Sequence, residues 1–315
     1  MALPDRGVNG PVTCLCGESR TQVVMTVGDP FCADPRRFQV AECLRCGLAR
    51  TLDGPEGPER ARWYADHYGA HQAEALRHRG LLRRAWQRLT GMHPYDILAR
   101  MPGGESLLEV GCGAGDVLEP LSARYRQVLG LEPDPGSARR ATARGLRVVA
   151  GDVDTFDPGA ERFSDLLFAF VLEHLADPVA ALTRVRGWLR PGGRLHVFCP
   201  DYASPHRAEL GEHWALWHVP YQRWFFCRKS LAEVLQRAGF ACERVRSYSR
   251  GGVQAMGEEL RRRAAAASAE RGFLPASGRL HELAIRWRGI RDAWRNRGDC
   301  LAVRARPTLD AGQSR

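Results

Sequence analysis

The sequence predicts an α/β fold with a doubly wound, seven-stranded sheet, preceded by a small cysteine-bearing module and carrying a helical insertion near the C-terminus. Three observations predict this fold. Apolar runs of strand length alternate with longer amphipathic stretches from residue 105 onward, which is typical of a parallel sheet covered by helices. The first apolar run ends in closely spaced glycines, and two cysteine pairs lie before it. A chain of 315 residues has room for one large α/β domain and small additions.

The glycine-rich turn lies in the run LLEVGCGAGD, residues 107–116. Glycine permits a positive φ and lets a ligand lie against the main chain, and a helix that begins after such a turn presents unpaired N–H groups. A dinucleotide fingerprint would need its third glycine at position 116, where this chain has Asp116. That carboxylate repels a pyrophosphate but suits a ligand with an adenosine and a positively charged end, such as S-adenosylmethionine.

The elements after this turn follow in a regular order. Glu132 ends the next predicted strand and lies about 20 residues past Gly111, the spacing at which an acidic side chain binds ribose hydroxyls. Asp152 follows the third strand, where a side chain can meet the adenine edge. We expect further strands at residues 127–131, 165–170, 194–199, 242–248 and 299–306, and a helix at 178–189.

The motifs EVGCGAG, LEPDP, GDV, VLEHLADP and LRPGGRL occur in this order. Over residues 107–240 the chain resembles the class I S-adenosylmethionine-dependent methyltransferases, which have a Rossmann-like fold. It is most similar to a bacterial family in which a small cysteine-rich, zinc-binding segment precedes the methyltransferase domain. The resemblance implies S-adenosylmethionine as cofactor, a last strand inserted antiparallel into the sheet, and a sugar or other small-molecule acceptor. The expected cofactor-binding residues are Glu109, Gly111, Gly113, Gly115, Glu132, Asp152, Val153 and Phe170.

The cysteine pairs suggest a structural zinc site formed by Cys14, Cys16, Cys43 and Cys46. The C-x2-C-G run at 43–47 is a typical metal knuckle, and two such pairs form a tetrahedral tetrathiolate site. The first pair is C-x-C-G, one residue shorter than the family pattern, and Cys32 could replace one of its ligands. The alternative is a module of reduced cysteines without metal. A module of this size has too little hydrophobic core to fold without a cross-link such as a metal site, which favours zinc.

Three histidines are candidate general bases. His174 follows the fourth strand, where ligands bind at the carboxyl edge of the sheet. His213 and His218 lie in the long aromatic loop after the fifth strand, whose length matches the family's substrate-capping segment. Family members carry P-R-H-L-x-H-F there, whereas residues 220–226 read PYQRWFF and lack both histidines. Phe170 replaces the first glutamate of the metal motif E-x-x-E-H of some relatives, so we expect no catalytic Mg²⁺.

The composition constrains partners and location. Residues 1–10 do not have the charge and apolar pattern of a signal peptide, and no apolar run is long enough to span a membrane. We therefore expect a cytoplasmic protein. The net charge of +10 suggests nucleic acid, but Lys229 is the only lysine, and an arginine excess beside abundant alanine and glycine is typical of GC-rich coding. A preference for anionic small molecules remains consistent with this charge.

We divide the chain into a cysteine module at residues 11–51, a helical linker or cap at 56–104, and a methyltransferase domain at 105–306 that contains a helical insertion at 251–297. Tyr64 and Tyr68 of the linker correspond to family tyrosines that reach over the cofactor. In the insertion, Trp287 and Trp294 belong to an apolar stripe beside an arginine face. Such a helix docks on its own domain, on a second copy in a homodimer, or on an anionic membrane surface.

Three functions are compatible with these observations. The leading hypothesis is a methyltransferase that acts on oxygen or carbon of a sugar or secondary-metabolite intermediate. The second is an RNA methyltransferase whose zinc module and basic helices grip phosphates. It is disfavoured because residues 169–172 read AFVL, where base N-methylating enzymes carry an N/D-P-P-Y/F tetrad. The third is a non-catalytic partner protein that binds the cofactor, which only the missing family histidines support.

Overall fold

The fold is described from a computed structural model that places residues 13–29, 36–57, 59–60, 100–248, 256–262, 287, 291–292 and 294–308. Tyr64, Tyr68 and Cys32, and most of the insertion at 251–297, lie outside these residues. The side chains of Trp287 and Trp294 within the insertion are 68% and 85% exposed. None of the helices in the described ranges has the length and hydropathy needed to cross a bilayer.

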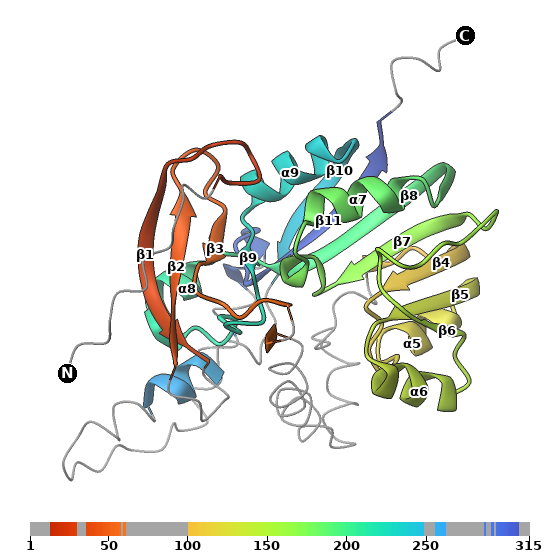
Figure 1. The fold of residues 1–315 in the computed structure, drawn as a ribbon, viewed down its shortest axis with the longest axis horizontal. Coiled ribbons are helices and arrows are strands. Elements are labelled where there is room, and N and C mark those ends of the chain that lie inside the picture. Colours follow the sequence, from red (N-terminus) through yellow and green to blue (C-terminus); the bar gives the residue numbers. More distant parts are fainter. Residues whose placement is uncertain are drawn as a thin grey trace.

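A seven-stranded sheet forms the body of the molecule, in the order β10-β11-β8-β7-β4-β5-β6 (Figure 1). The strands β4, β5, β6, β7 and β8 pair in parallel, while β11 runs antiparallel to both β8 and β10. This topology confirms the predicted fold class, including the last strand inserted antiparallel. The bounds are β4 Gly104–Val110, β5 Tyr125–Glu132, β6 Val148–Ala150, β7 Phe163–Ala169, β8 Leu189–Pro200, β10 Phe240–Tyr248 and β11 Cys300–Pro307.

Short helices connect the strands, and their starts follow from local sequence. Asp134 and Asp177 cap the two helices that begin Pro135 and Pro178, accepting hydrogen bonds from the N–H groups of Ser137 and Ala180. Proline suits the first helical position because its missing N–H has no partner there. The helices are α5 Leu118–Ser122, α6 Pro135–Ala143, α7 Pro178–Arg186, α8 Pro205–Leu210 and α9 Arg228–Arg237, with single turns η2 Leu172–His174 and η3 Gly211–His213.

The fifth strand differs from its prediction. β8 begins at Leu189 rather than at residue 194, and the Pro-Gly-Gly sequence lies inside it. Phe163 pairs with Leu189 while Asp165 pairs with Arg194, so β8 has extra residues between these two pairs. A bulge of this kind leaves residues unpaired in a ladder, and Gly192 adopts a φ of 77° there. The glycines therefore form a bulge within the strand rather than a turn before it.

A four-stranded antiparallel sheet stands beside the large one, in the order β1-β2-β3-β9 (Figure 1). Its strands are β1 Thr21–Gly28, β2 Arg37–Cys43, β3 Ala49–Thr51 and β9 Trp224–Phe225. The last strand comes from the segment after β8, about 170 residues downstream of β3. Thr51 extends this junction, because its N–H donates to the Arg223 carbonyl and its hydroxyl to the Gln222 carbonyl. The N-terminal module is thus joined to the segment predicted to cap the acceptor.

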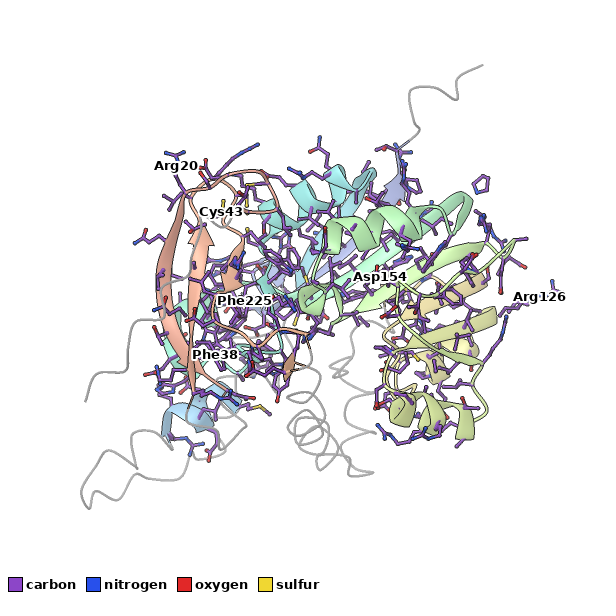
Figure 2. All side chains as sticks on the ribbon, viewed as in Figure 1. Arg20, Phe38, Cys43, Arg126, Asp154 and Phe225 are labelled. Carbon is purple, nitrogen blue, oxygen red and sulfur yellow. The ribbon has the colours of Figure 1, made fainter. Side chains whose placement is uncertain are left out.

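The aromatic residues of this capping segment, residues 200–230, are packed into the core. Trp214, Trp217, Tyr221 and Phe225 are all buried. The ring centroids of Trp214 and Trp217 lie 5.3 Å apart, and those of Trp217 and Phe225 lie 5.1 Å apart, in edge-to-face geometry that aromatic pairs prefer. Phe225 and Phe38 lie in the dense side-chain packing beside the small sheet (Figure 2). These rings hold the two sheets together rather than line an open apolar pocket.

Candidate functional site

The glycine-rich turn joins β4 to α5 at the carboxyl edge of the large sheet. A Cβ on Gly111 would lie 2.5 Å from Val171, and one on Gly115 would lie 2.3 Å from Leu146. Gly113 differs from both, because a Cβ there would meet no atom of the described residues within 4 Å. All three have positive φ. The outer glycines therefore allow close packing, and the middle one borders space where a ligand could lie.

Glu132 lies beside this turn at the end of β5, as its spacing predicts. Its Oε2 accepts the Gly113 N–H at 2.8 Å, and its Oε1 accepts the Asp134 N–H at 2.9 Å. Burial raises the pKa of Glu132 above its ordinary value, although these two N–H donors oppose the shift. The structure thus brings Gly113 and Glu132 together, and each carboxylate oxygen keeps a second lone pair for a hydroxyl donor.

Glu109 lies in β4 just before the turn, and its side chain is buried. Burial raises its pKa well above the ordinary value, and the charges of Glu132 and Asp116 raise it further. Its Oε2 has no hydrogen-bond partner among the described residues. Buried polar atoms are nearly always paired, so a ligand with a cationic donor fits this position. A pyrophosphate does not fit, because it would add negative charge to an acidic cluster.

Asp116 contributes less to discrimination against phosphates than the sequence suggests. Its carboxylate accepts from Arg144 at 2.9 Å, and Arg144 also bonds Glu119 and the Ala114 carbonyl. The Arg144 guanidinium balances much of the negative charge of Asp116 and stabilises the glycine-rich turn through the Ala114 carbonyl. Discrimination against phosphates therefore falls mainly on the buried pair Glu109 and Glu132. The sequence offered no signal for Arg144, which lies in the connection between α6 and β6.

Asp152 and Val153 follow β6 at the same edge of the sheet, and Gly151 N–H donates to the Glu132 carbonyl at 3.0 Å. Oδ1 of Asp152 accepts from the N–H groups of Asp154 and Thr155 and from the Thr155 hydroxyl. The Thr155 hydroxyl is the main reason why the pKa of Asp152 is lowered, with burial opposing it. Val153 is buried in the core. Asp152 thus stabilises its own turn, and contact with an adenine remains a prediction for both residues.

Phe170 directly follows β7 and has a φ of 59°. A positive φ is uncommon for a bulky residue and marks strain that the surroundings must hold in place. The Phe170 N–H donates to the Phe198 carbonyl of β8 at 2.8 Å. The next residue, Val171, is the one that packs against Gly111. Phe170 therefore lies next to the glycine turn, and its contact with a cofactor remains a prediction.

His174 ends the turn η2 and is half-buried. Its Nδ1 lies 2.9 Å from the carbonyl oxygen of Tyr221. A carbonyl can only accept, so Nδ1 carries the proton, and in the neutral ring the basic lone pair is on Nε2. This bond fixes the tautomer and orients the ring against the capping segment. The arrangement suits a general base that acts through Nε2.

The two other candidate bases lie in different places. His218 is half-buried and belongs to the same loop as Tyr221, where its carbonyl accepts the Gln222 N–H. His213 lies in η3, which packs against β1, and its carbonyl is 3.1 Å from the position of a Cβ on Gly257. The structure thus brings the loop of His218 to His174 and places His213 beside the small sheet. Catalytic roles for all three remain predictions.

Glu173 is an ionisable residue of this corner that the sequence reasoning did not single out. Its side chain is 1% exposed, and both carboxyl oxygens lack hydrogen-bond partners among the described residues. Burial raises the pKa of Glu173 to about 8. The Glu173 carbonyl accepts the N–H of Arg223, next to β9. Its position in the motif LEH was the only available signal, and only the folded chain shows that the carboxyl points inward.

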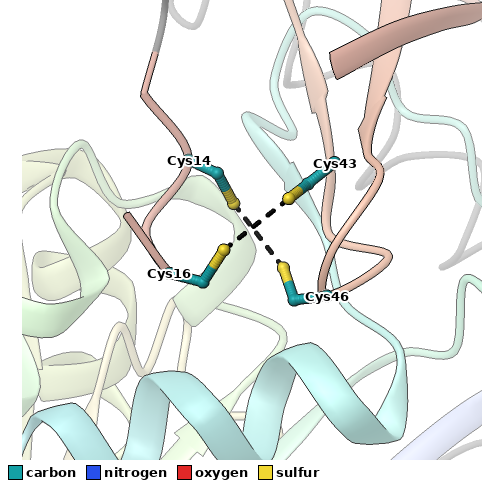
Figure 3. Close-up of side chains that lie close together, drawn as sticks. All are labelled: Cys14, Cys16, Cys43 and Cys46. Atoms are coloured by element: carbon teal, nitrogen blue, oxygen red, sulfur yellow. Dashed lines mark hydrogen bonds between the residues drawn. The ribbon is translucent and has the colours of Figure 1, made fainter. Parts of the chain in front are cut away.

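The four predicted cysteines converge from two loops of the small sheet (Figure 3). Cys14 Sγ lies 3.6 Å from Cys46 Sγ, and Cys16 Sγ lies 3.6 Å from Cys43 Sγ. All four sulfur atoms lie within 4.8 Å of one another and are buried. A tetrahedral site with Zn–S bonds of about 2.3 Å has sulfur atoms about 3.8 Å apart. The shortened C-x-C pair therefore reaches the cluster, and the four residues fit zinc.

The cysteine cluster rests on the start of α9, where it is tied to the large domain. The Cys227 thiol donates to the Cys46 carbonyl at 3.6 Å, and Lys229 donates to the Arg45 carbonyl. The cysteines belong to the same continuous core as Leu108 of β4. This cluster therefore supports the junction between the small sheet and the methyltransferase fold.

Comparison with known proteins agrees with this geometry. Residues 70–245 match a family described as a methyltransferase domain. The chain belongs to this family. It is 39% identical over 113 residues to trans-aconitate 2-methyltransferase of Methylobacterium nodulans, a match that covers 34% of the chain and 43% of that protein. It is 38% identical over 158 residues to a ubiquinone biosynthesis O-methyltransferase of Cereibacter sphaeroides, covering 46% of the chain and 64% of that protein. Matches to these relatives thus span about half of their length.

Among solved structures, the chain is similar to the complex between the Haloferax volcanii Trm112 methyltransferase activator and the putative methyltransferase. The identity is 19% and the TM-score 0.52, over 81% of this chain and 100% of that one. At this identity the likeness shows the fold of the methyltransferase family and nothing about partners.

Proposed function

We propose that the chain is an S-adenosylmethionine-dependent methyltransferase that methylates oxygen or carbon of a small molecule, a sugar or secondary-metabolite intermediate. The observation that carries this proposal is the acidic edge formed by Glu109, Gly113 and Glu132. Among the described residues it combines a buried carboxyl oxygen without a donor, a glycine with no neighbour within 4 Å of a Cβ, and a carboxylate at the spacing expected for ribose hydroxyls. The names of the curated relatives favour small-molecule acceptors over RNA.

Each residue at this edge has a distinct task in the proposed function. Glu132 would hold the ribose hydroxyls, Glu109 would meet the methionine ammonium, and Gly113 would leave room for the cofactor. When bound, S-adenosylmethionine supplies an electrophilic methyl carbon on a sulfonium. His174 would remove the acceptor proton through Nε2, with its ring held by the Tyr221 carbonyl. The four cysteines would bind a structural zinc ion at the module junction.

Gly113→Arg is expected to abolish binding of S-adenosylmethionine, because the long side chain would enter the space beside Glu132. Isothermal titration calorimetry of the full chain measures the loss. Gly159→Arg is the matched control, since Gly159 has a φ of 59° against 56° for Gly113 and a Cβ there also meets no described atom within 4 Å, but it lies in the turn between β6 and β7. Tight binding by Gly113→Arg would rule out the proposed cofactor site.

His174→Asn is expected to lower kcat by about 100- to 10,000-fold, the usual contribution of a general base. Asparagine keeps a donor near the Nδ1 position for the Tyr221 carbonyl but has no basic nitrogen. Affinity for the cofactor should stay at the wild-type value. Release of S-adenosylhomocysteine is measured across pH, with an acceptor that the wild-type protein methylates. A variant that retains wild-type kcat would exclude His174 as the base.

A further inference from the structure

A cavity of about 200 Å³ lies where β3 and β9 meet. Its floor is formed by the small sheet, and one wall is the segment that follows η2, through Ala176. This volume is below the roughly 300 Å³ at which pockets hold whole drug-sized ligands, so it suits one group of a larger molecule. The described residues lining it are Arg50, Thr51, Leu52, Gly54, Pro55, Glu56, Arg60, Ala176, Pro220, Arg223 and Trp224.

The cavity is strongly positive. Three of its described lining residues are arginines, and the only carboxylate among them is Glu56, whose side chain is 78% exposed. Arg50 lies over the Trp224 ring, with its Cζ 5.7 Å from the centroid. Burial lowers the pKa of Arg50, and the charge of Arg223 adds to this while Glu56 opposes it. The guanidinium groups thus repel one another in a partly desolvated space.

Arg223 also has positive charge and a hydrogen-bond donor that its described neighbours do not fully compensate. Its Nη1 pairs with Glu56 at 3.0 Å, while its Nε is buried and has no hydrogen-bond partner in the described part of the chain. Guanidinium groups form parallel, charge-assisted hydrogen bonds to carboxylates and phosphates. A bound anion would supply both the missing acceptor and the missing negative charge.

Arg60 connects this cavity to the candidate base. Its guanidinium donates to the carbonyls of His174, Pro220 and Tyr221. The Tyr221 carbonyl is the group that also accepts from His174 Nδ1. The cavity and the His174 ring are therefore separated by a single wall of main chain, and a group held in the cavity lies across this wall from His174.

We propose that this cavity binds the anionic group of the acceptor, a phosphate ester or a carboxylate, through Arg50 and Arg223. The inference rests on the proposed function and narrows its substrate class to acidic small molecules. Arg60 organises the wall, and Arg50 and Arg223 provide the donors. The arginines converge from the N-terminal module and from the segment after β8, so the junction of the two sheets creates the site.

The test is calorimetric titration of the full chain with inorganic phosphate and, separately, with succinate at constant ionic strength. Saturable binding of either anion is expected, and the tighter one identifies the phosphate or the carboxylate source. Arg50→Gln should weaken that binding about tenfold, the usual value of one hydrogen bond to a charged group. The Arg50 side chain makes no hydrogen bond to another described residue, and its backbone pairing with β2 and β9 does not depend on the side chain, so the variant should fold. Arg223→Gln is the second variant and should weaken binding similarly.

Arg126→Gln is the matched control, because its side chain is 80% exposed on β5, at the far end of the molecule from β9 (Figure 2). Absence of saturable binding, or equal weakening in Arg50→Gln and Arg126→Gln, would overturn the anion site. S-adenosylhomocysteine is titrated into the same preparations. If it binds while the anions do not, only this inference fails; if the anions bind and it does not, the proposed function fails.

Discussion

Cys46→Ser is expected to release one zinc ion per chain and to lower the free energy of unfolding by more than about 4 kcal/mol, a size that loss of a metal site can produce. The reason is geometric, because the four sulfur atoms lie within 4.8 Å of one another in the core. The binding free energy of a structural zinc site is folding free energy, since the unfolded chain lacks the site. Zinc is measured by emission spectrometry of the purified protein, and stability by urea denaturation.

The consequence should extend beyond the module. The Cys46 carbonyl accepts from Cys227 at the start of α9, and β3 pairs with β9. Loss of the cluster is therefore expected to loosen the capping segment and the arginine cavity as well. Cys242→Ser is the control, because Cys242 is an exposed thiol on β10. Zinc retained at full stoichiometry by Cys46→Ser, or a wild-type protein whose stability chelators do not change, would contradict a tetrathiolate zinc site.

Glu173→Gln is expected to stabilise the protein at pH 8 and to have little effect near pH 4.5. Burial raises the pKa of Glu173 in the folded protein to about 8, from an ordinary value of 4.5. Between these values the folded state holds a proton that the unfolded state has lost. The contribution of the neutral carboxyl is thus fully present below pH 4.5 and declines by about 1.4 kcal/mol per pH unit until the folded pKa is reached.

The measurement is urea denaturation of wild type and variant from about pH 3 to pH 8.5, which spans the ordinary pKa of a glutamate. The difference in unfolding free energy should grow with pH and then level off. Glu243→Gln tests the sign, because burial raises the pKa of Glu243 but Arg194 and Arg304 outweigh it and lower the pKa. Its small stabilisation is present at neutral pH and lost as pH falls. A pH-independent difference for Glu173→Gln would show that this carboxyl is not held neutral.

The predicted elements and the observed ones agree where the signal is local. The glycine spacing and most strand positions depend on residues close in sequence, whose backbone preferences act over a few positions. The pairing of Gly113 with Glu132 also followed from spacing, because neighbouring parallel strands place their carboxyl ends at one edge. The bulge in β8 was missed, since Pro-Gly-Gly is equally typical of a turn.

The charge balance at Asp116 and the tautomer of His174 depend on contacts between residues far apart in sequence, which no spacing rule describes. Arg144 reaches Asp116 from another connection, and the Tyr221 carbonyl sets the proton on His174 from the capping segment. The sequence predicts an aromatic capping segment, and only the fold shows that Trp214 and Trp217 pack in the junction between the sheets. Solvent exposure of a side chain follows from packing against distant residues, which an apolar pattern alone does not specify.

The sequence by itself determined the fold class and predicted a cofactor half of the site, because both depend on periodicity and on the φ requirements of one turn. It also named the four cysteines, since their identity and approximate spacing suffice for a thiolate site. The acceptor half that we propose depends on the tertiary structure alone. Arg50 and Arg223 are far apart along the chain and become neighbours through the two-residue strand β9. Their two guanidinium groups can act on the same ligand only because the fold holds both in one partly desolvated cavity.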